Sequence, residues 1–564
     1  MMGCGNIAEY TQDITEQETK KFQIQNINEQ NQQKYIQRQS PRQLNLKQLT
    51  VCIVGCTHAG TMAAIALRNM DPKIRIIAFE KTPTVSFLNC GIHLAVNKTC
   101  SDLSKMFYNS PVNMRKLGIE IYTNTYVEHI NFQNKQLLAL DQVGQTQQTF
   151  QYDKLIIATG SKPVIPPVID GIDYNKDPVD EIRNNLNRIL VVKTYKDAQR
   201  LIALKDVKKI LILGAGHIGM EMVWSFQSIG AKVTVLDHGP HIMGKYFDPE
   251  YIQILEDECK NLEIELWMKA RVVKMQETQY GVQVTVERIV GDTIKTIQAI
   301  FDYVLLAIGF KPNTEQLIAE SSNQLWNMKN VILVNQKQQT SITDVYAIGD
   351  CSTSYHTLLN KQTYIPLASH AVRQGVTAAY QALGNELRTA GTNCSYGIQL
   401  FNYSLASTGF SYEQAEKMFT NVGRIVYSDY LWQKYCEKKV DKVIQKEELG
   451  SHFTILGDMV RDMADMIVES FDMDIEQTED QLVSVILVIN QNNNKIIGCQ
   501  VMGKQDITQI VNAASIAIQT GMTIQELAFS DLGGFEGETK PWGILQMAAA
   551  SVDIAVPDFE EEEF

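Results

Sequence analysis

Cys90 is the first candidate for chemistry in this sequence, because its thiol can act as a nucleophile. It lies within Ser-Phe-Leu-Asn-Cys-Gly-Ile at residues 86–92. A thiol of ordinary pKa, about 8.5, is mostly protonated at neutral pH, whereas the thiolate is the nucleophile. Asn89 and Gly91 are consistent with a helix that starts directly after this turn, where free backbone N–H groups would favour a thiolate. The alternative is a buried structural cysteine, which is the usual fate of a free cysteine. The flanking segments have to decide between these two interpretations.

The segment before Cys90 has the pattern of a nucleotide-binding unit: an apolar strand at 50–54, a turn at 55–60, a helical run at 61–69 and a strand at 74–79. Glycines in such a turn allow the backbone to approach a pyrophosphate at the helix N-terminus, and an acid after the second strand can bind ribose hydroxyls. The middle glycine of G-x-G-x-x-G is a threonine here, so this fingerprint is imperfect. The residues predicted to contact the nucleotide of this unit are Gly55, Thr57, His58, Ala59, Gly60, Glu80 and Lys81.

A second unit of the same kind follows, and its glycine fingerprint is complete. A strand is predicted at 210–213, the fingerprint occupies 214–219, and a further strand at 233–236 ends in Asp237. An acid at that position accepts hydrogen bonds from a free ribose 2′-hydroxyl and repels a 2′-phosphate, so the sequence favours NADH over NADPH. The predicted contacts to this nucleotide are Gly214, Gly216, His217, Ile218, Gly219 and Asp237.

The turn at 54–60 together with the segment at 86–91 resembles one branch of the pyridine nucleotide–disulfide oxidoreductases, which contains NADH oxidases, NADH peroxidases and coenzyme A-disulfide reductases. The resemblance covers about residues 49–425 and 480–555. It implies an α/β fold with two Rossmann-like dinucleotide-binding domains, one for FAD and one for NAD, and an α+β C-terminal dimerisation domain. The expected assembly is therefore a homodimer.

The resemblance also implies a mechanism in which Cys90 and His58 are catalytic. NADH would pass a hydride to FAD, the reduced flavin would react with O2, and the Cys90 thiolate would take up the resulting peroxide and become a sulfenic acid. A second NADH would restore the thiolate, so the predicted function is an NADH oxidase that forms water. His58 would lie near the flavin and Cys90 as a proton acceptor. The alternative for His58 is a capping or phosphate-side residue without an acid–base role.

Further cofactor contacts are implied by the same resemblance. The strand and small-residue turn at 152–161 are similar to the segment that returns the chain past FAD, and residues 343–350 look like the second FAD motif, whose aspartate binds the ribityl chain. A helix at 371–383, preceded by 366–369, would direct its N-terminus at the flavin pyrimidine. The residues implied are Cys90, Ala158, Thr159, Gly160, Ser161, Gly349, Asp350, Leu367, Ala368, Ser369 and Phe535 for the flavin site, and Tyr246 and Gly309 for the NAD side.

The predicted domain organisation combines these motifs with changes in composition along the chain. Strands are expected at 398–401, 483–488 and 495–502, an apolar helix at 507–520 and a capped helix from Thr523. The predicted parts are a Gln/Asn-rich disordered extension at 1–48, the first FAD part at 49–189, the NAD domain at 190–310, the second FAD part at 311–390, the dimerisation domain at 391–555 with an insertion at about 430–478, and an acidic tail at 556–564.

Composition limits the classes of partner and compartment. The net charge of −13 argues against a nucleic-acid partner, which would need a basic face. No apolar run reaches the ~20 residues of a membrane span, and no signal peptide is predicted. The ten cysteines include no C-x-x-C pair, which suits a reducing compartment and excludes a zinc ribbon, so no metal is expected. The predicted location is cytoplasmic.

The first residues raise one possibility of membrane association. If translation starts at Met2, Gly3 is a candidate for myristoylation and Cys4 for palmitoylation. The Ser or Thr expected further along is missing, since Ile7 stands there, and the hypothesis fails if translation starts at Met1.

Several functions remain open at this stage. A coenzyme A-disulfide or persulfide reductase would use the same Cys90, and an NADH peroxidase is a further option. A non-enzymatic alternative is a membrane-tethered redox sensor or adaptor, in which the insertion binds a partner. Family members often carry a His-Pro pair close to the active site of the other subunit, where this chain has Phe535-Glu536-Gly537-Glu538, and its absence leaves the oxidant open.

Overall fold

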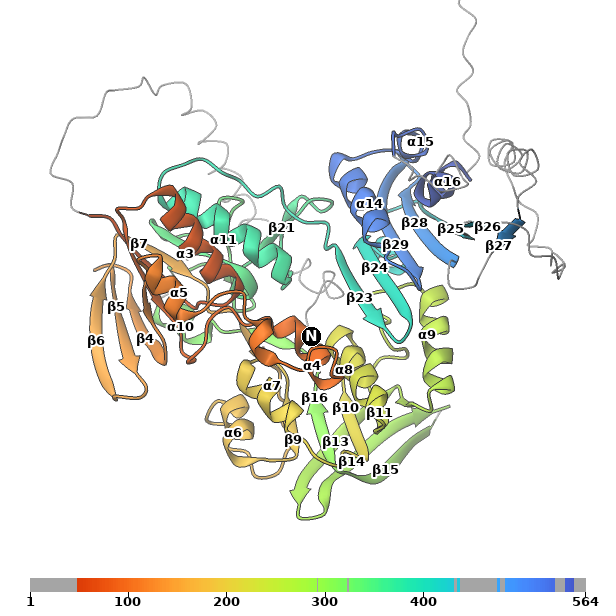
Figure 1. The fold of residues 1–564 in the computed structure, drawn as a ribbon, viewed down its shortest axis with the longest axis horizontal. Coiled ribbons are helices and arrows are strands. Elements are labelled where there is room, and N and C mark those ends of the chain that lie inside the picture. Colours follow the sequence, from red (N-terminus) through yellow and green to blue (C-terminus); the bar gives the residue numbers. More distant parts are fainter. Residues whose placement is uncertain are drawn as a thin grey trace, which may run out of the picture. The chain divides into compact units, whose positions relative to one another are not determined.

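The structure is a computed structural model, and it describes residues 48–291, 293–321, 324–430, 434–436, 474–476, 482–532 and 543–551 (Figure 1). The chain divides into two compact units, described separately below: an N-terminal unit of Met1–Lys245 with Leu255–Thr392, and a C-terminal unit of Tyr246–Ile254 with Asn393–Phe564. Among the helices of the described ranges, none has the length and apolarity needed to cross a bilayer. The predictions for the extension at 1–47, for most of the insertion, for Phe535 and for the acidic tail lie outside the described residues.

The first sheet of the N-terminal unit confirms the first predicted dinucleotide unit. Its parallel strands lie in the order β20-β7-β1-β2-β3 and consist mainly of Val, Ile, Leu and Ala, as expected for strands that are buried on both faces. The helix after the first strand starts at His58, three residues earlier than predicted. The strands are β1 (Thr50–Val54), β2 (Arg75–Phe79), β3 (Glu120–Tyr122), β7 (Lys154–Ile157) and β20 (Val345–Ala347), and the helices are α3 (His58–Met70) and α11 (Ala368–Ala382).

Helices α3 and α11 cover one face of this sheet. Leu67 of α3 and Ala378 of α11 are fully buried in the core that the helices form with the strands. The two helices approach so closely that a Cβ on Gly375 would lie 2.4 Å from the carbonyl oxygen of Ala59, so only glycine fits there.

A three-stranded antiparallel sheet, which the sequence analysis did not predict, contributes to the core on the other face. Val127, Leu137 and Phe150 from this sheet pack in one cluster with Ile77 and Ile157 of the parallel sheet. Its strands are β4 (Thr125–Asn131), β5 (Gln136–Asp141) and β6 (Thr146–Gln151).

The second parallel sheet confirms the second predicted dinucleotide unit and has the order β12-β11-β10-β16-β9. An antiparallel meander, β13-β14-β15, contributes Met275, Val284 and Val286 to the same core as Leu211 and Val304. The elements are β9 (Ile189–Val191), β10 (Lys209–Leu213), β11 (Lys232–Leu236), β12 (Glu265–Trp267), β13 (Ala270–Thr278), β14 (Gly281–Val290), β15 (Thr293–Phe301), β16 (Tyr303–Leu306), α6 (Pro178–Asn185), α7 (Tyr195–Ile202) and α8 (His217–Ser228).

Short elements complete the N-terminal unit and include the segment that carries Cys90. That segment is a 3₁₀ turn, η2 (Asn89–Gly91), which continues into α4 (Ile92–Val96). The others are η3 (Leu103–Met106), α5 (Pro111–Lys116), β8 (Ser161–Pro163), β17 (Phe310–Pro312), α10 (Glu315–Glu320), β18 (Asn327–Met328), β19 (Val331–Ile332), η4 (Gly349–Cys351), β21 (Ser354–His356) and β22 (Lys361–Thr363).

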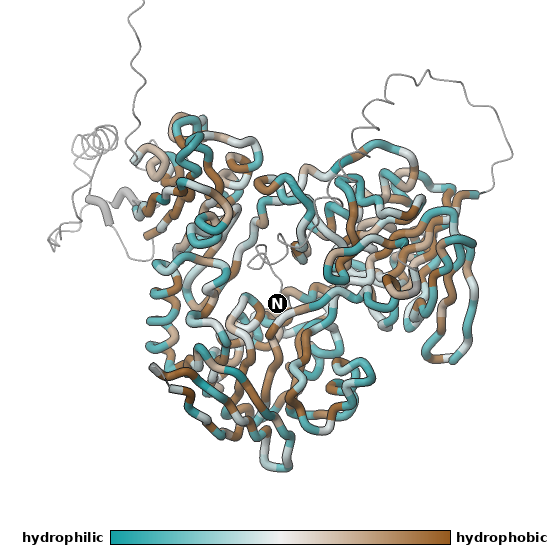
Figure 2. Tube along the Cα trace, turned by 180° about the vertical axis from the view of Figure 1, so that it is seen from behind, coloured by the Kyte–Doolittle hydropathy of each residue, from teal (hydrophilic) through white to brown (hydrophobic). Residues whose placement is uncertain are grey.

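The C-terminal unit is an antiparallel sheet with helices, which confirms the predicted α+β class of this part. Its main sheet has the order β23-β24-β29-β28-β25, and Gly521 ends α14 in the left-handed conformation at φ +75°. In Figure 2 hydrophobic stretches gather in the interior of each unit. The elements are β23 (Tyr396–Leu400), β24 (Tyr403–Gly409), α12 (Tyr412–Glu416), β25 (Val422–Tyr430), β26 (Lys434–Cys436), β27 (Asp474–Glu476), β28 (Leu482–Asn490), β29 (Lys495–Gly503), α14 (Thr508–Thr520), α15 (Ile524–Ala528) and α16 (Ile544–Ala550).

One short segment from the middle of the chain belongs to the C-terminal unit. Residues 246–254, which include the first turns of α9 (Pro249–Asn261), group with the antiparallel sheet. The carboxylate of Asp248 is fully buried and accepts hydrogen bonds from the backbone N–H of Tyr412 at 2.9 Å and from the amide of Gln500 at 2.6 Å. The backbone N–H of Asp248 in turn donates to the amide oxygen of Gln500 at 2.9 Å. This two-way pairing fixes the segment on β29.

We predict that Gln500→Leu destabilises the C-terminal unit by about 2–4 kcal/mol, because a buried carboxylate and a buried N–H each lose a partner. Burial raises the pKa of Asp248, and the Gln500 hydrogen bond opposes that rise by stabilising the ionised form. The loss should therefore be larger at pH 7 than at pH 3, where the carboxyl group is protonated. Urea denaturation at both pH values measures this loss of stability, with Gln399→Leu, at an exposed position of β23, as the matched control. Equal unfolding midpoints for the two variants would contradict the prediction.

Candidate active site

The two glycine turns of the N-terminal unit have nearly the same backbone geometry. Gly55 has a φ of +98°, and a Cβ placed on it would lie 2.2 Å from the carbonyl oxygen of Ala158, at the end of β7. Gly214 has a φ of +106°, and its Cβ would lie 2.3 Å from the carbonyl oxygen of Ala307, at the end of β16. Both positions require glycine for conformation and for space, since any side chain would push the turn away from the neighbouring strand.

The helix that follows each turn also packs on it through a glycine. A Cβ on Gly60 would lie 1.9 Å from the carbonyl oxygen of Gly55, and one on Gly219 would lie 1.8 Å from that of Gly214. The N-cap residues of α3 and α8 make no side-chain cap hydrogen bond, which leaves first-turn N–H groups available for an anion. Both turns therefore fit a pyrophosphate. The predicted residues placed around these helix starts are Thr57, His58 and Ala59 on α3, and Gly216, His217 and Ile218 on α8.

An acid at the end of each second strand is bound to the turn. Glu80 accepts the backbone N–H of Cys56 at 2.9 Å, and Asp237 accepts the backbone N–H of Ala215 at 2.8 Å. Glu80 also accepts the N–H and hydroxyl of Thr82, each at 3.0 Å. Each acid is therefore fixed where a ribose would lie relative to the turn. Lys81, also predicted as a contact, is exposed beside Glu80.

Asp350 lies in η4 directly after β20 and faces a lysine that the sequence analysis missed. Its carboxylate accepts hydrogen bonds from the Ser161 hydroxyl at 2.6 Å and from the Lys193 ammonium at 3.2 Å. Burial alone would raise the pKa of Asp350, but Lys193 and Ser161 hold it below its usual range. The group is therefore ionised at neutral pH and can accept hydrogen bonds from hydroxyls such as those of a ribityl chain.

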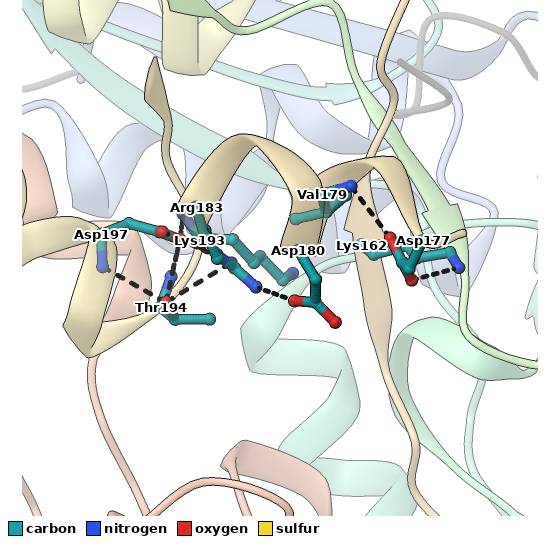
Figure 3. A network of polar contacts seen from close by, with 8 residues as sticks. All are labelled: Lys162, Asp177, Val179, Asp180, Arg183, Lys193, Thr194 and Asp197. Atoms are coloured by element: carbon teal, nitrogen blue, oxygen red, sulfur yellow. Dashed lines mark hydrogen bonds and ion pairs between the residues drawn. The ribbon is translucent and has the colours of Figure 1, made fainter. Parts of the chain in front are cut away.

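The position of Lys193 is set by a polar network at the start of α7 (Figure 3). The backbone N–H of Lys193 donates to the Asp197 carboxylate at 3.1 Å, and Arg183 binds the same carboxylate at 2.9 and 2.7 Å. Thr194 and Asp197 form a capping box. The Lys193 ammonium also lies 4.4 Å from the centre of the Phe310 ring. No pattern in the sequence distinguishes this lysine from the others.

The remaining predicted flavin-side residues are brought to the same edge of the first sheet. The amide of Gln374, another residue that the sequence analysis missed, accepts the backbone N–H of Gly349 at 2.7 Å and donates to the carbonyl of Thr353 at 3.0 Å. This joins α11 to the turn that carries Asp350. Ala158, Thr159 and Gly160 follow β7, Leu367 is the N-cap residue of α11, and Ala368 and Ser369 are its first residues.

The last three predicted contacts differ in where the structure puts them. Tyr246 belongs to the C-terminal unit, where its carbonyl accepts a hydrogen bond from the hydroxyl of Tyr396 at 2.9 Å. Gly309 follows β16 with a φ of +125°, on the same side as Ala307. Phe535 lies outside the described residues. The cofactor-binding role of each predicted residue remains a prediction.

The segment that carries Cys90 is anchored to the first glycine turn. Ser86 adopts a φ of +58°, is fully buried, and its hydroxyl lies 2.8 Å from that of Thr61 on α3. Its backbone N–H donates to the carbonyl of Cys56 at 3.1 Å. Phe87 then packs against Phe107, with ring centres 5.1 Å apart. These contacts anchor the segment that carries Cys90 to the first dinucleotide turn.

Cys90 is exposed, whereas the other seven cysteines whose side chains the structure describes are buried or half-buried. The surrounding protein nevertheless desolvates the thiol, and together with the Glu221 carboxyl group this raises its pKa. The net shift is therefore opposite to the one expected from a helix start that favours the thiolate. The helix α4 that follows has only five residues, and the effect of its N–H groups is outweighed. A base is needed to generate a thiolate at neutral pH.

His58, the predicted base, lies beside the residue that precedes Cys90. Its Nε2 is 3.1 Å from the amide oxygen of Asn89, and its Nδ1 is 2.9 Å from the hydroxyl of Tyr108. Since an amide oxygen only accepts, Nε2 donates to Asn89 and Nδ1 accepts from Tyr108. Burial lowers the pKa of His58, so the imidazole is neutral at pH 7 and can accept a proton.

These features define an oxidoreductase built on two dinucleotide-binding sheets, with an exposed cysteine beside the first one. Residues 49–375 match the family described as pyridine nucleotide-disulphide oxidoreductases, and the chain belongs to this family. Its cofactors are FAD and NADH.

Several characterised proteins are similar to this chain over most of their length. A protein named NADH oxidase from Enterococcus faecalis is 31% identical over 503 residues, which is 89% of this chain and 98% of that protein. The solved structure of a water-forming NADH oxidase from Lactobacillus brevis bound to NADH superposes with a TM-score of 0.73 at 26% identity, over 89% of this chain and 97% of that one. A protein named NAD(P)H sulfur oxidoreductase (CoA-dependent) from Pyrococcus abyssi is 27% identical over 65% of this chain and 77% of its own length.

We expect the purified protein to be yellow, with about one FAD per chain, and Gly55→Ala to abolish flavin retention because the methyl group would lie 2.2 Å from the Ala158 carbonyl oxygen. Absorbance near 450 nm, about where oxidised flavins absorb, measures the flavin content after gel filtration. Gly230→Ala is the matched control, because Gly230 also has a positive φ, at +89°, but no atom lies within 4 Å of its Cβ position. A folded Gly55→Ala protein with full flavin content would contradict the predicted role of the turn at 55–60 in binding FAD.

We also expect NADH to be preferred over NADPH at least tenfold in kcat/KM, and Asp237→Asn to narrow that preference. The Asp237 carboxylate would face a 2′-phosphate, and each 1.4 kcal/mol of repulsion corresponds to about a tenfold difference. Asparagine keeps the size of the side chain and one oxygen for the N–H of Ala215, which lies 2.8 Å from the carboxylate. Initial rates with each nucleotide give the ratio. If the Asp237→Asn variant keeps the wild-type ratio of kcat/KM for NADH to that for NADPH, other residues determine the nucleotide specificity.

Proposed function

We propose that the protein is an FAD-dependent NADH oxidase that reduces O2 to water through Cys90. The observation that carries the proposal is the exposed Cys90 thiol on a segment anchored to the first dinucleotide turn, next to the pair formed by His58 and Asn89, which lie 3.1 Å apart. The overall reaction balances as two NADH, two protons and one O2 giving two NAD⁺ and two water molecules. The similarity to the Lactobacillus brevis enzyme, named as water-forming, supports this choice of acceptor.

In this proposal the residues of the chain bind both nucleotides and hold the redox centres in sequence. The turn at 214–219 and Asp237 hold NADH, while the turn at 55–60, Glu80 and Asp350 hold FAD. When bound, FAD carries electrons from NADH to dioxygen and to Cys90. Lys193, placed at the start of the NAD-binding part, neutralises the carboxylate of Asp350 in the flavin-binding part and keeps it ionised.

Cys90 carries out the second half of the reaction, the reduction of hydrogen peroxide to water. Its thiolate attacks the hydrogen peroxide formed from O2, and one oxygen stays on sulfur as a sulfenic acid while the other leaves as water once protonated. Because the pKa of Cys90 is raised, we assign the removal of the thiol proton to the neutral imidazole of His58, which lies next to Asn89, the residue before Cys90. NADH then returns the sulfenic acid to the thiolate, with release of the second water.

The proposed assembly is a homodimer formed through the C-terminal unit, located in the cytoplasm. Ile516 on α14 and Phe529 after α15 support a contact surface there, since their side chains are 62% and 64% exposed. Apolar side chains that project from one unit in this way are typical of subunit interfaces.

A second candidate is a coenzyme A-disulfide or persulfide reductase. The similarity to the Pyrococcus abyssi protein, whose name describes a CoA-dependent sulfur oxidoreductase, favours it. The same Cys90 would then attack a disulfide or persulfide sulfur and form a mixed disulfide rather than a sulfenic acid.

The test is Cys90→Ser, which we expect to convert a water-forming enzyme into a peroxide-forming one. Serine cannot form a sulfenic acid, whereas nucleotide binding does not depend on the thiol. The wild type should consume two NADH per O2, and the variant about one, with hydrogen peroxide accumulating. An oxygen electrode and a peroxidase-coupled assay measure both quantities in one cuvette.

Cys100→Ser is the matched control, since Cys100 is the half-buried cysteine nearest in sequence and is expected to leave the ratio at two. Water formation at the wild-type ratio by Cys90→Ser would show that the cysteine is structural. A wild type that ignores O2 but oxidises NADH with coenzyme A disulfide would favour the second candidate.

A further inference from the structure

A glutamate and a histidine near Cys90 have no part in the mechanism above. Glu221 lies on α8, two residues after the glycine fingerprint, and His93 lies on α4, one turn beyond Cys90. The Nδ1 atom of His93 is 3.1 Å from the backbone carbonyl oxygen of Cys90 and 3.7 Å from Oε2 of Glu221. Because a carbonyl oxygen only accepts, Nδ1 carries the proton and donates it to Cys90. One imidazole nitrogen therefore connects the redox segment to the NAD-binding helix.

A second contact fixes α4 against α8. The hydroxyl of Ser225 on α8 lies 3.0 Å from the backbone carbonyl oxygen of His93 and 2.8 Å from that of Glu221. Ser225 is fully buried, and the side chains of His93 and Glu221 are only 15% and 20% exposed. The Glu221 carboxyl group therefore lies largely shielded from water, where α4 packs on α8.

We propose that Glu221 is the proton donor for the oxygen atom that leaves when Cys90 cleaves a hydroperoxide, and that His93 is the positioning residue that holds α4 and Cys90 against it. This inference rests on the proposed function, since it assigns a further residue to the same site.

The proposed step balances in atoms and charge. The Cys90 thiolate attacks one oxygen of a hydroperoxide, an S–O bond forms and the O–O bond breaks, so that sulfur is oxidised and the peroxide is reduced. The proton of the Glu221 carboxyl group goes to the departing oxygen. Thiolate, hydrogen peroxide and carboxylic acid become sulfenic acid, water and carboxylate, with one negative charge on each side. The carboxylate regains its proton from solvent.

The charges around Glu221 suit this role. Burial raises the pKa of Glu221 to about 8, so most of it is protonated at pH 7. Glu221 interacts with Cys90 on η2 and with His93 on α4, and burial lowers the pKa of His93 so that it is neutral. His217, one turn earlier on α8, is also neutral, because burial lowers its pKa to about 3. Lys193 ahead of α7 acts on Cys90, whose pKa it lowers. Strands β10 and β11, which also pack on α8, carry their charges at their first residues, Lys209 and Lys232.

Glu221→Gln in the holoenzyme tests the proposal, because glutamine keeps the shape of the side chain but cannot donate a proton from a carboxyl group. Enzyme reduced with NADH and freed of excess nucleotide is mixed anaerobically with hydrogen peroxide. The sulfenic acid is trapped at set times with a 1,3-diketone, and the adduct on the Cys90 peptide is measured by mass spectrometry. We expect the rate constant of the variant at pH 7 to be about 100-fold lower, the usual contribution of a general acid.

The pH dependence separates proton donation from a structural role. The ratio of the wild-type to the variant rate constant should fall about tenfold per pH unit above about 8, where Glu221 loses its proton. The ionisation of Cys90 affects both proteins and largely cancels in this ratio. A merely structural contribution of Glu221 would leave the ratio constant with pH.

Glu256→Gln is the matched control, since Glu256 on α9 also pairs with a histidine, His241, at 3.1 Å, and is expected to leave the rate constant unchanged. His93→Leu should lower the rate constant, and His93→Gln, which can still donate to the Cys90 carbonyl, should restore most of it. The proposal is overturned if the ratio of the wild-type to the Glu221→Gln rate constant stays near one, or if this ratio does not change with pH. A wild type whose Cys90 forms no sulfenic acid with peroxide overturns the proposed function itself, and this inference with it.

Discussion

The close approach of two glycine turns to a neighbouring strand is the constraint on which both nucleotide sites depend. At Gly55 and at Gly214 the space where a side chain would begin is already occupied by the carbonyl oxygen of the alanine that ends the adjacent strand. The following helix then packs so tightly on the turn that its own first glycine touches the carbonyl oxygen of Gly55 or Gly214. Because the helix start, the turn and the strand end are in contact, a phosphate at the helix N-terminus, a ribose at the acid and the next loop of the site all have fixed relative positions.

The reactive side of the site is dominated by desolvation rather than by charge. Burial raises the pKa values of Cys90 and Glu221 and lowers that of His58, so the neutral form of each is favoured near pH 7. The flavin-side pair of Asp350 and Lys193 is the opposite case, since two full charges 3.2 Å apart stabilise each other against burial. In the proposed function, the neutral groups on the Cys90 side exchange protons, and the paired charges of Asp350 and Lys193 on the flavin side bind hydroxyl groups. This separation suits an enzyme that has to transfer protons during the reaction and still keep its cofactor bound when the pH changes.

Sequence reasoning predicted the parts of the fold that are encoded locally. The apolar strands, the glycine turns and the acids Glu80 and Asp237 lie where their order along the chain required, because a strand–turn–helix unit leaves few alternatives. The antiparallel strands β4, β5 and β6 were not predicted, since their alternation resembles that of many surface segments. Lys193 and Gln374 were missed because their roles depend on partners far along the chain, which no local pattern encodes.

The direction of the Cys90 pKa shows why local patterns also misled. A cysteine at a helix start suggests a stabilised thiolate, but that effect scales with the aligned peptide groups behind it, and α4 offers only five residues. Against it act the loss of water around the sulfur and the carboxyl group of Glu221, which comes from a helix more than one hundred positions away in the sequence. A raised pKa is not a defect for a thiol that reacts with peroxide, because intrinsic nucleophilicity falls as the pKa of a thiol falls. The cost is that the thiolate has to be generated on demand, and the proposed function assigns this task to the neutral imidazole of His58, which is held between Asn89 and Tyr108.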